Sequence, residues 1–317
     1  MLNKELRGKG WVRYKRQFEL QLFAYLGIVF LAVFSWAPLF GLIIAFKDYS
    51  INTGISGIFT SQWNNFKFFK EFFTSYRFSE LLRNTIVVSV LKLIFTFPAP
   101  IILALLLSEV RVSFFKRFVQ TVSYLPNFIS WVLVYTITYN LLSEEVGAIN
   151  NLMVNLGIIE KPLPIMSSPD HFYSLAVGLS VWKTTGWSAI IFLAAISGVD
   201  PALYEAASID GAGRLGRIWH VTLPSIRGAI ITVLIISIGG MLGGGMGGSN
   251  FEISYLFGNP NNYKTADIIQ KYAFDMGLKN GRFAFATAVD LCQSIISVTL
   301  VLISNKIAKM ISGEGLF

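Results

Sequence analysis

The sequence predicts an all-α, polytopic membrane protein with six transmembrane helices and a short cytoplasmic helix between the fourth and fifth of them. Two observations predict this fold class. First, 54% of the 317 residues are hydrophobic and only 14% are charged, whereas about a quarter of the residues in soluble domains are charged. Second, six apolar segments each supply the roughly 20 helical residues that cross a bilayer. They span 20–46, 84–108, 118–142, 172–198, 226–246 and 284–304.

The first segment is predicted to remain in the mature protein as a membrane helix. From Leu20 to Phe46 it carries no charge, and this run is longer than the roughly 7–15 residues of a signal-peptide core. A small-residue cleavage pattern does not follow it. Six basic residues precede it within 1–19, namely Lys4, Arg7, Lys9, Arg13, Lys15 and Arg16.

The second and third segments contain prolines that should kink them. Pro98 and Pro100 lie in the second and Pro126 in the third. Inside a membrane, the carbonyls that a proline frees need neighbouring donors or water. The prolines therefore favour a bundle with an internal path over a single anchor.

The distribution of Lys and Arg sets the expected orientation, because these residues accumulate in cytoplasmic loops. The segments 1–19, 109–117, 199–225 and 305–317 are then cytoplasmic, so both termini lie inside and 20–304 forms the membrane domain. The net charge of +8 is explained by this topology, and a basic stripe that would indicate nucleic-acid binding is not apparent.

Two further stretches suggest local structure on the outer side. Tyr263 to Leu278 has apolar residues at helical spacing and predicts one amphipathic helix. Gly239 to Gly248 is rich in glycine and predicts a flexible or closely packed end to the fifth helix.

The segment 199–225 carries the most specific pattern. Asp200 and Pro201 are suited to the start of a short helix, as its cap and its first residue. Glu205, Ala206 and Ala207 follow, and Asp210-Gly211 ends the helix in a turn. Leu215, Ile218 and Trp219 then form a second apolar stripe, and Pro224 opens the fifth membrane helix. The alternative is an amphipathic loop that lies on the membrane surface.

This segment closely resembles the EAA loop of binding-protein-dependent ABC importer permeases. The pattern is filled by Glu205, Ala206, Ala207, Gly211, Val221, Leu223 and Pro224. The resemblance implies that the helix is a coupling helix seated in a cleft of an ATPase subunit. The residues expected to couple are Glu205, Ala206, Ala207, Asp210, Gly211, Leu223 and Pro224.

A nucleotide-binding motif is absent from the sequence, because the glycines at 239–248 are not followed by Gly-Lys-Ser/Thr. The resemblance therefore implies that the chain is not an enzyme and binds no cofactor. ATP and Mg²⁺ would bind to a partner ATPase dimer, and ATP hydrolysis there would drive alternating access.

Weaker similarities extend over most of the chain and indicate a branch of this family. The run from Trp182 to Trp187, Asn259-Pro260 and Ala266-Asp267 look like the permeases that import oligosaccharides derived from polysaccharides or complex glycans. That branch implies an extracytoplasmic solute-binding protein, a second related permease in a heterodimer, and a multi-pass location in a bacterial cell membrane among its lipids. Two departures from the branch are Asp290 and the many glycines at 239–248.

Five residues are candidates for the substrate path. Sugars bind to aromatic faces and to planar polar groups, which favours Trp187, Tyr135 and Asn127, although Trp and Tyr also gather at membrane interfaces. Lys183 and Asp290 lie inside membrane segments, where a charge costs roughly 2.5–3.5 kcal/mol on insertion scales. We therefore expect these two to pair or to share a wet cavity, either on the path or as a static ion pair.

Other functions are less well supported by the sequence. An ABC importer of peptides or amino acids is the main alternative, since the substrate signal is weaker than the family signal. A secondary transporter would show related halves with broken helices, and an EAA loop would be unnecessary. A membrane enzyme or a metal site lacks ligands, because the chain has only His171, His220 and Cys292.

Overall fold

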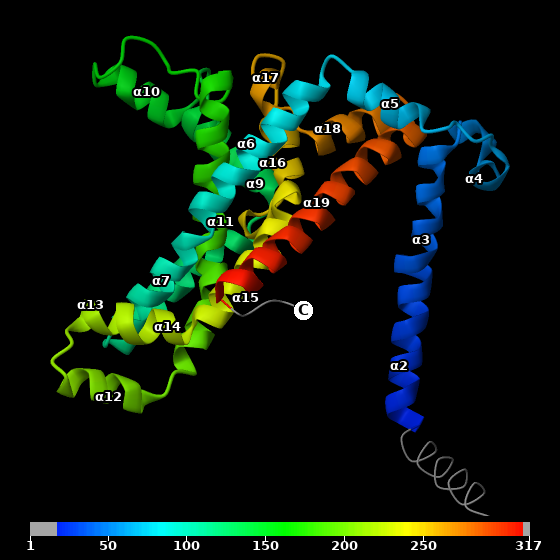
Figure 1. Ribbon diagram of the computed structural model, residues 1–317. Helices are drawn as coiled ribbons and strands as arrows, with labels where there is room; N and C mark the ends of the chain where they lie inside the picture. Colours follow the sequence, from blue (N-terminus) through cyan, green and yellow to red (C-terminus); the bar gives the residue numbers. More distant parts are fainter. Residues whose placement is uncertain (1–17, 313–317) are drawn as a thin grey trace, which may run out of the picture.

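A computed structural model describes residues 18–312 and confirms an all-α membrane fold. Four helical stretches are long and apolar enough to cross a bilayer: Gln21–Phe46, Phe78–Glu109, Pro169–Ser197 and Phe283–Met310. A bent pair, Arg214–Ser225 and Arg227–Gly243, makes a fifth candidate span if it is counted as one. The described residues therefore contain four to five candidate spans. Figure 1 shows α12 (Pro201–Ile209) and the beginning of α2 (Phe18–Leu31) at one end of the molecule, here called the α12 end. The opposite end, here called the α10 end, contains α4 (Gly57–Thr60), α5 (Lys67–Thr74), α10 (Ala148–Asn155) and α17 (Tyr263–Ala266).

The first span is a chain of four helical pieces that stands apart from the rest in Figure 1. They are α2 (Phe18–Leu31), the π-helix η1 (Ala32–Trp36), α3 (Ala37–Leu39) and the 3₁₀-helix η2 (Phe40–Phe46). From Gln21 to Ile44 none of its side chains is buried. Its main contact with the bundle is made by η2, which packs on α19 (Phe283–Ser312). After η3 (Ile51–Thr53), the short helices α4 (Gly57–Thr60) and α5 (Lys67–Thr74) lead to the second span.

The second and fourth spans form the centre of the bundle. The second consists of α6 (Phe78–Thr96) and α7 (Pro98–Glu109), so the predicted kink falls at Pro98. The fourth is the 29-residue helix α11 (Pro169–Ser197), which packs along both α6 and α7. One of the buried apolar clusters lies where α11 meets α9 (Trp131–Leu142) and α16 (Asn250–Phe257), around Trp131, Phe172 and Ile253.

The third predicted segment is not one continuous helix. It consists of α8 (Ser113–Tyr124), the 3₁₀ turn η4 (Leu125–Phe128) and α9 (Trp131–Leu142), and α10 (Ala148–Asn155) follows it. Pro126 lacks the N–H that a continuing helix would use. A new helix then begins because the Ser130 side chain accepts a bond from the Leu133 N–H at 3.3 Å. The break is thus wider than the predicted kink.

The glycine-rich stretch that follows α15 (Arg227–Gly240) is closely packed. It forms two 3₁₀ turns, η6 (Met241–Gly243) and η7 (Gly245–Gly247), before α16 (Asn250–Phe257). A Cβ added at Gly247 would lie 2.7 Å from Lys92 Cε, and one added at Gly244 would lie 1.7 Å from the Gly248 oxygen. Of the two predicted possibilities, a closely packed end is therefore the one observed.

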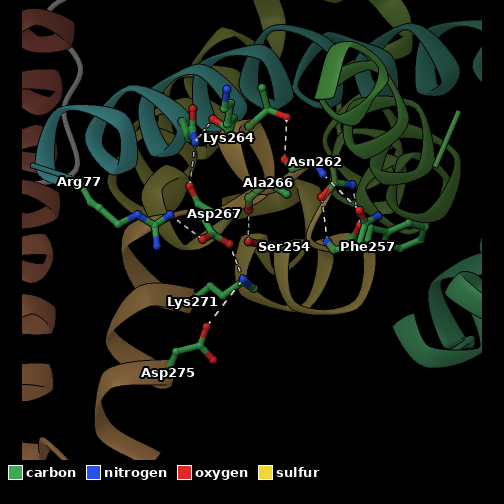
Figure 2. Close-up of polar contacts among 12 residues, drawn as sticks. Arg77, Ser254, Phe257, Asn262, Lys264, Ala266, Asp267, Lys271 and Asp275 are labelled. Carbon is green, nitrogen blue, oxygen red and sulfur yellow. Dashed lines mark hydrogen bonds and ion pairs between the residues drawn. The ribbon is translucent and has the colours of Figure 1, made fainter. Parts of the chain in front are cut away.

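The prediction of one continuous amphipathic helix over 263–278 is wrong. The chain forms α17 (Tyr263–Ala266), α18 (Ile269–Phe274) and the π-helix η8 (Asp275–Lys279), with a break at Asp267. Figure 2 shows the reason: the Asp267 carboxylate pairs with Arg77 at 2.7 Å and with Lys271. The Asp267 carbonyl also accepts a hydrogen bond from Asn84 Nδ2 at 2.9 Å. Tertiary contacts with α6 therefore replace helical ones here.

Arg77 lies just outside the membrane helix α6 and contributes to this outer cluster. Burial alone would lower the pKa of its guanidinium, but the carboxylates of Asp267 and Glu80 outweigh that effect and raise the pKa. The same cluster contains Asn262, which donates to the Phe257 carbonyl at 3.0 Å (Figure 2). Together these bonds fasten the α17–α18 hairpin onto the α10 end of α6.

Candidate functional sites

The segment 199–225 begins with a short capped helix, α12 (Pro201–Ile209). The Asp200 carboxylate accepts a hydrogen bond from the Ala202 N–H at 2.9 Å, and Pro201 occupies the first turn. The helix ends before Asp210, and Gly211 adopts a positive φ of 80° in the turn that follows. The start and stop that the sequence predicted are both confirmed.

A second limb runs from the turn back to the fifth span. It consists of α13 (Arg214–Arg217), the π-helix η5 (Ile218–Thr222) and α14 (Leu223–Ser225). The hydroxyls of Tyr204 and Thr222 lie 3.1 Å apart and join the two limbs. Beyond Ser225 the chain bends by 65° into α15. The two limbs are therefore joined to each other, and the second leads directly into α15.

The surface of α12 is free in the described part of the chain. None of its residues is buried, and Glu205 and Ala206 are exposed. Glu205 forms no ion pair with any residue between 18 and 312. Ile209 is 87% exposed, and on the second limb Leu215 is 73% exposed. Small and apolar side chains around a free carboxylate, at the tip of a projecting hairpin, are suited to docking in a cleft of another protein.

Lys183 is buried in α11 and bonds to the break in the third segment. Its ammonium donates to the Asn127 carbonyl at 2.8 Å, to the Pro126 carbonyl at 3.2 Å and to the Ile129 carbonyl. It also lies 5.7 Å from the centre of the Trp131 ring. The helix is broken at these residues, so Lys183 supplies donors to main-chain carbonyls at the break that the membrane interior would not supply. The Pro126 carbonyl also accepts a hydrogen bond from the Ile129 N–H at 3.2 Å.

Asn127 and Trp187 lie at the same break. Asn127 contributes its main-chain oxygen to Lys183, and its side chain is partly exposed. Trp187 is 48% exposed, and its ring packs edge-on against Phe128 at 5.4 Å between centroids. The structure therefore brings three of the five predicted path residues together.

Tyr135 lies at a second candidate site, nearer the α10 end. Its ring packs edge-on against Phe257 at 5.2 Å and lies 6.0 Å from the Tyr139 ring. Both tyrosines line a polar cavity of about 380 Å³ together with Glu144 and Glu145.

Asp290 lies at a third candidate site, a cavity of about 810 Å³ between α15, α18, η8 and α19. Here called the α19 cavity, it is lined by Gly239, Gly240, Gly243, Phe251, Gln270, Ala273, Phe274, Gly277, Leu278, Phe283, Ala286, Thr287, Asp290, Gln293, Ser294, Ser297 and Val298. Asp290 is exposed to this space and forms no ion pair within residues 18–312.

The predicted meeting of Lys183 and Asp290 is wrong. Lys183 bonds to three main-chain carbonyls, and it does not line the α19 cavity. The prediction rested on the cost of leaving two charges apart inside the membrane, and it did not consider main-chain carbonyls as acceptors for the Lys183 ammonium. The break at Pro126 supplies those partners instead.

Sequence reasoning missed a buried polar cluster that holds the glycine-rich stretch. Lys92 is 1% exposed and donates to the Gly248 carbonyl at 2.9 Å and to Asn250 Oδ1 at 2.8 Å. Asn250 Nδ2 donates in turn to the carbonyls of Met241 and Leu242, each at 3.1 Å. A lysine within an apolar run was the available signal, although its partner lies 156 residues further on.

A bundle of apolar helices with cavities between them, and an exposed helical hairpin at one end, is typical of a multi-pass membrane transport subunit. The family model of the binding-protein-dependent transport system inner membrane component matches residues 96–312. The chain belongs to this family. It is therefore a multi-pass transport subunit of the inner membrane, it is not an enzyme, and the ATPase is a separate partner. The resemblance carried by 199–225 is confirmed at the level of the family.

Two bacterial relatives match over nearly their whole length. The chain is 43% identical to protein LplB of Bacillus subtilis (strain 168) over 98% of this chain and 95% of LplB. It is 40% identical to the polygalacturonan/rhamnogalacturonan transport system permease protein YteP of the same strain, over 100% of this chain and 96% of YteP.

A solved structure has the same fold. A chain in the crystal structure of a bacterial ABC transporter involved in the import of the acidic polysaccharide alginate is 33% identical, with a TM-score of 0.84 over 95% of this chain and 99% of that one. A second structure of an alginate ABC transporter, in complex with an alginate pentasaccharide-bound periplasmic protein, matches with the same TM-score and identity.

Proposed function

We propose that this chain is the permease of an importer that carries oligosaccharides, released from polysaccharides or complex glycans, into a bacterial cell. The single observation that carries the proposal is full-length similarity to a permease named for polygalacturonan and rhamnogalacturonan, at 40% identity. The alginate transporter chain, at 33% identity, supports the same substrate class. The aromatic and polar side chains at Trp187, Asn127 and Tyr135 are of the kind that bind sugars.

Within this function, α12 is the helix that couples the permease to the ATPase. Its free surface, with Glu205 exposed next to Ala206 and Ala207, supports this role. Asp210 and Gly211 shape the turn that follows. Leu223 and Pro224 lead into the bend of 65° before α15. Binding of α12 by a closing ATPase would tilt α15 and open the α10 end.

Six crossings with both termini in the cytoplasm fit this arrangement best. The break at Pro126 divides the third segment into α8 and α9, and together these would complete a sixth crossing. The beginning of α2 and the coupling helix α12 then lie at the same, cytoplasmic end (Figure 1). The predicted basic segment 1–19 falls almost entirely outside the described residues, as do residues 313–317 of the predicted C-terminal segment 305–317.

The partners are an ATPase dimer, a solute-binding protein at the α10 end and a second, related permease. The first span supports the second permease, because none of its side chains is buried from Gln21 to Ile44. Lipid would cover part of this apolar surface, and a neighbouring permease would cover the rest.

The experiment is transport by the complete importer, reconstituted with its second permease, ATPase and binding protein. We expect an oligosaccharide-loaded binding protein to stimulate both ATP hydrolysis and uptake. Glu205→Ala should remove that stimulation and leave the protein inserted, because the exposed carboxylate acts only on the ATPase. Glu160→Ala, another exposed glutamate near the α10 end, is the matched control and should behave as wild type.

Two outcomes would contradict the proposal. Full uptake by Glu205→Ala would remove the coupling role from α12. Uptake of peptides or amino acids, with no response to any oligosaccharide, would replace the substrate class.

A further inference from the structure

The connection between α7 and α8, residues 109–118 and here called the α8 corner, is strongly basic. Arg111, Lys116 and Arg117 fall within seven residues of one another, and Glu109 is the only acidic residue between 98 and 124. Within residues 18–312, the side chains of these three basic residues form neither an ion pair nor a hydrogen bond. Arg111 and Arg117 are exposed, so their charge is available to a molecule outside this chain.

The same corner carries large apolar side chains that the bundle does not cover. Phe114 is 82% exposed, Phe115 is 53% exposed and Phe118 is 58% exposed. Phe118 and Val122 follow Phe114 at one and two helical repeats of four residues, so they lie on one face of α8. An exposed apolar face therefore begins directly beside the basic residues.

The opposite face of α8 is polar and is turned toward the bundle. Lys116, Gln120 and Ser123 follow one another at helical spacing, and all three are partly buried. The main chain at Ser123 touches α11, because a Cβ added at Gly186 would lie 2.0 Å from the Ser123 carbonyl oxygen. Polar residues in membrane segments generally face the bundle interior. The outward, apolar face of α8 is therefore suited to lipid.

The depth of the α8 corner matches the edge of the membrane. Figure 1 shows α7 running toward the α12 end, and α8 returns from there along α11. At about 1.5 Å per helical residue, Ser113 lies about 15 Å before Ser123, and Ser197 ends α11 about 17 Å beyond Gly186. The start of α8 is thus level with the end of a membrane span, where lipid headgroups meet the acyl chains.

We propose that the α8 corner binds anionic phospholipids. The guanidinium groups of Arg111 and Arg117 donate to the phosphate oxygens, with Lys116 beside them, and the phenylalanine rings insert among the acyl chains. Charge complementarity favours this occupant: an apolar helix of another protein would cover the rings and leave the basic groups unpaired, whereas an anionic lipid satisfies both. In the orientation of the proposed function these lipids belong to the cytoplasmic leaflet, where basic segments next to a membrane helix attract anionic lipid.

The test measures contact with brominated lipids in the complete importer, assembled with partner chains that lack reactive cysteines. Cys292, the only cysteine of this chain, is replaced by serine, and Phe114→Cys carries a bimane fluorophore. The importer is reconstituted in liposomes of phosphatidylcholine and phosphatidylglycerol in equal amounts. Either one lipid or the other carries bromine on its acyl chains. Because bromine quenches the fluorophore on contact, the two measurements report which lipid occupies the site.

We expect phosphatidylglycerol to be preferred several-fold beside Phe114→Cys, since each basic residue near an anionic surface is worth about fivefold in binding. Arg111→Gln combined with Arg117→Gln should bring the preference close to one. Salt at about 1 M should do the same, because the Debye length there is about 3 Å. Ile102→Cys, at an exposed position of α7, is the control and should show no preference. Val112→Cys repeats the measurement if Phe114→Cys does not fold.

Three results would overturn the inference. Equal quenching by the two lipids at Phe114→Cys would remove the charge selection. Quenching by neither lipid would mean that a neighbouring protein covers the α8 corner. A preference that persists without the two arginines, or that Ile102→Cys shares, would reflect anionic lipid gathered around the whole protein. ATP hydrolysis stimulated by the oligosaccharide-loaded binding protein is measured in the same liposomes, so a failure of this site is distinguished from a failure of the proposed function.

Discussion

Lys183 shows how a single residue can keep a membrane helix broken. Its ammonium spans three main-chain carbonyls, those of Pro126, Asn127 and Ile129. The buried ammonium and the carbonyls that accept from it stabilise each other, because removing either leaves the other without its hydrogen-bond partner. The contacts of Lys183 therefore support a structural role, in which it stabilises the break between α8 and α9.

We predict that Lys183→Met lowers stability more than transport by each folded molecule. The Asn127 and Ile129 carbonyls would lose the ammonium donor, at a cost of about 1–3 kcal/mol each, whereas the Pro126 carbonyl keeps its bond from the Ile129 N–H. The thermal midpoint and the folded yield in membranes should therefore fall. Lys70→Met, at an exposed lysine of α5, is the control and should leave both unchanged. Normal stability with a higher KM for the saccharide would instead place Lys183 on the substrate path.

At this scale the sequence was most informative where the interactions are local. Asp200, Pro201 and Gly211 define α12 through neighbours within a few residues, and their roles were predicted correctly. The partner of Lys183 was not, because it lies 54–57 residues away and appears only once the helix has broken. A charge in an apolar run indicates that a partner exists and does not identify it.

At the scale of elements, α8 and α11 approach each other closely at one glycine. A Cβ added at Gly186 would lie 2.0 Å from the Ser123 carbonyl oxygen and 2.3 Å from its carbon. Both are main-chain atoms, so a side-chain rotation cannot relieve the clash. Because Gly186 has no side chain, α8 can pack directly against α11 just before the Pro126 break.

We predict that Gly186→Ala destabilises the permease by about 1–3 kcal/mol, the usual cost of overpacking. Gly178→Ala is the control on the same helix, because nothing lies within 4 Å of its added Cβ. That change should be neutral or stabilise α11 by up to about 1 kcal/mol. Thermal unfolding in nanodiscs compares the two, and equal midpoints would show that α8 can move aside.

Which elements exist was predictable, and where they break was less so. Apolar runs located the long helices, because a continuous run is a property of the sequence itself. The breaks at Asp267 and near Ile129 are stabilised by Arg77, Asn84 and Lys183, which belong to other segments of the chain. Periodicity in one segment contains no information about donors on another.

At the scale of the whole molecule, the two ends differ in structure and should differ in exposure to the cytoplasm. Figure 1 places α12 at one end and α10 at the other. Positively charged segments are retained inside, and the predicted cytoplasmic segments include 199–225. If α12 binds an ATPase, the α12 end faces the cytoplasm and the α10 end faces outward.

We predict that an impermeant thiol reagent added to intact cells modifies Glu160→Cys but neither Ser208→Cys nor Gly8→Cys, each made with Cys292 replaced by serine. Inverted vesicles should reverse the pattern. The three variants are matched in reagent and background, so the contrast reports topology alone. Modification of Gly8→Cys from outside would place the N-terminus on the wrong side and exclude this orientation.

The bond between Lys92 and the glycine-rich stretch also constrains how the protein is made. Lys92 enters the bilayer with the second span, yet its acceptors on Gly248 and Asn250 are 156 and 158 residues further along the chain. At a synthesis rate of about 5–20 residues per second, roughly 8–30 s pass before the ribosome reaches them. During that interval the apolar neighbours in α6 must retain the lysine in the membrane unaided. The half of the bundle that contains α15 and α16 therefore completes its packing only after most of the chain has left the ribosome.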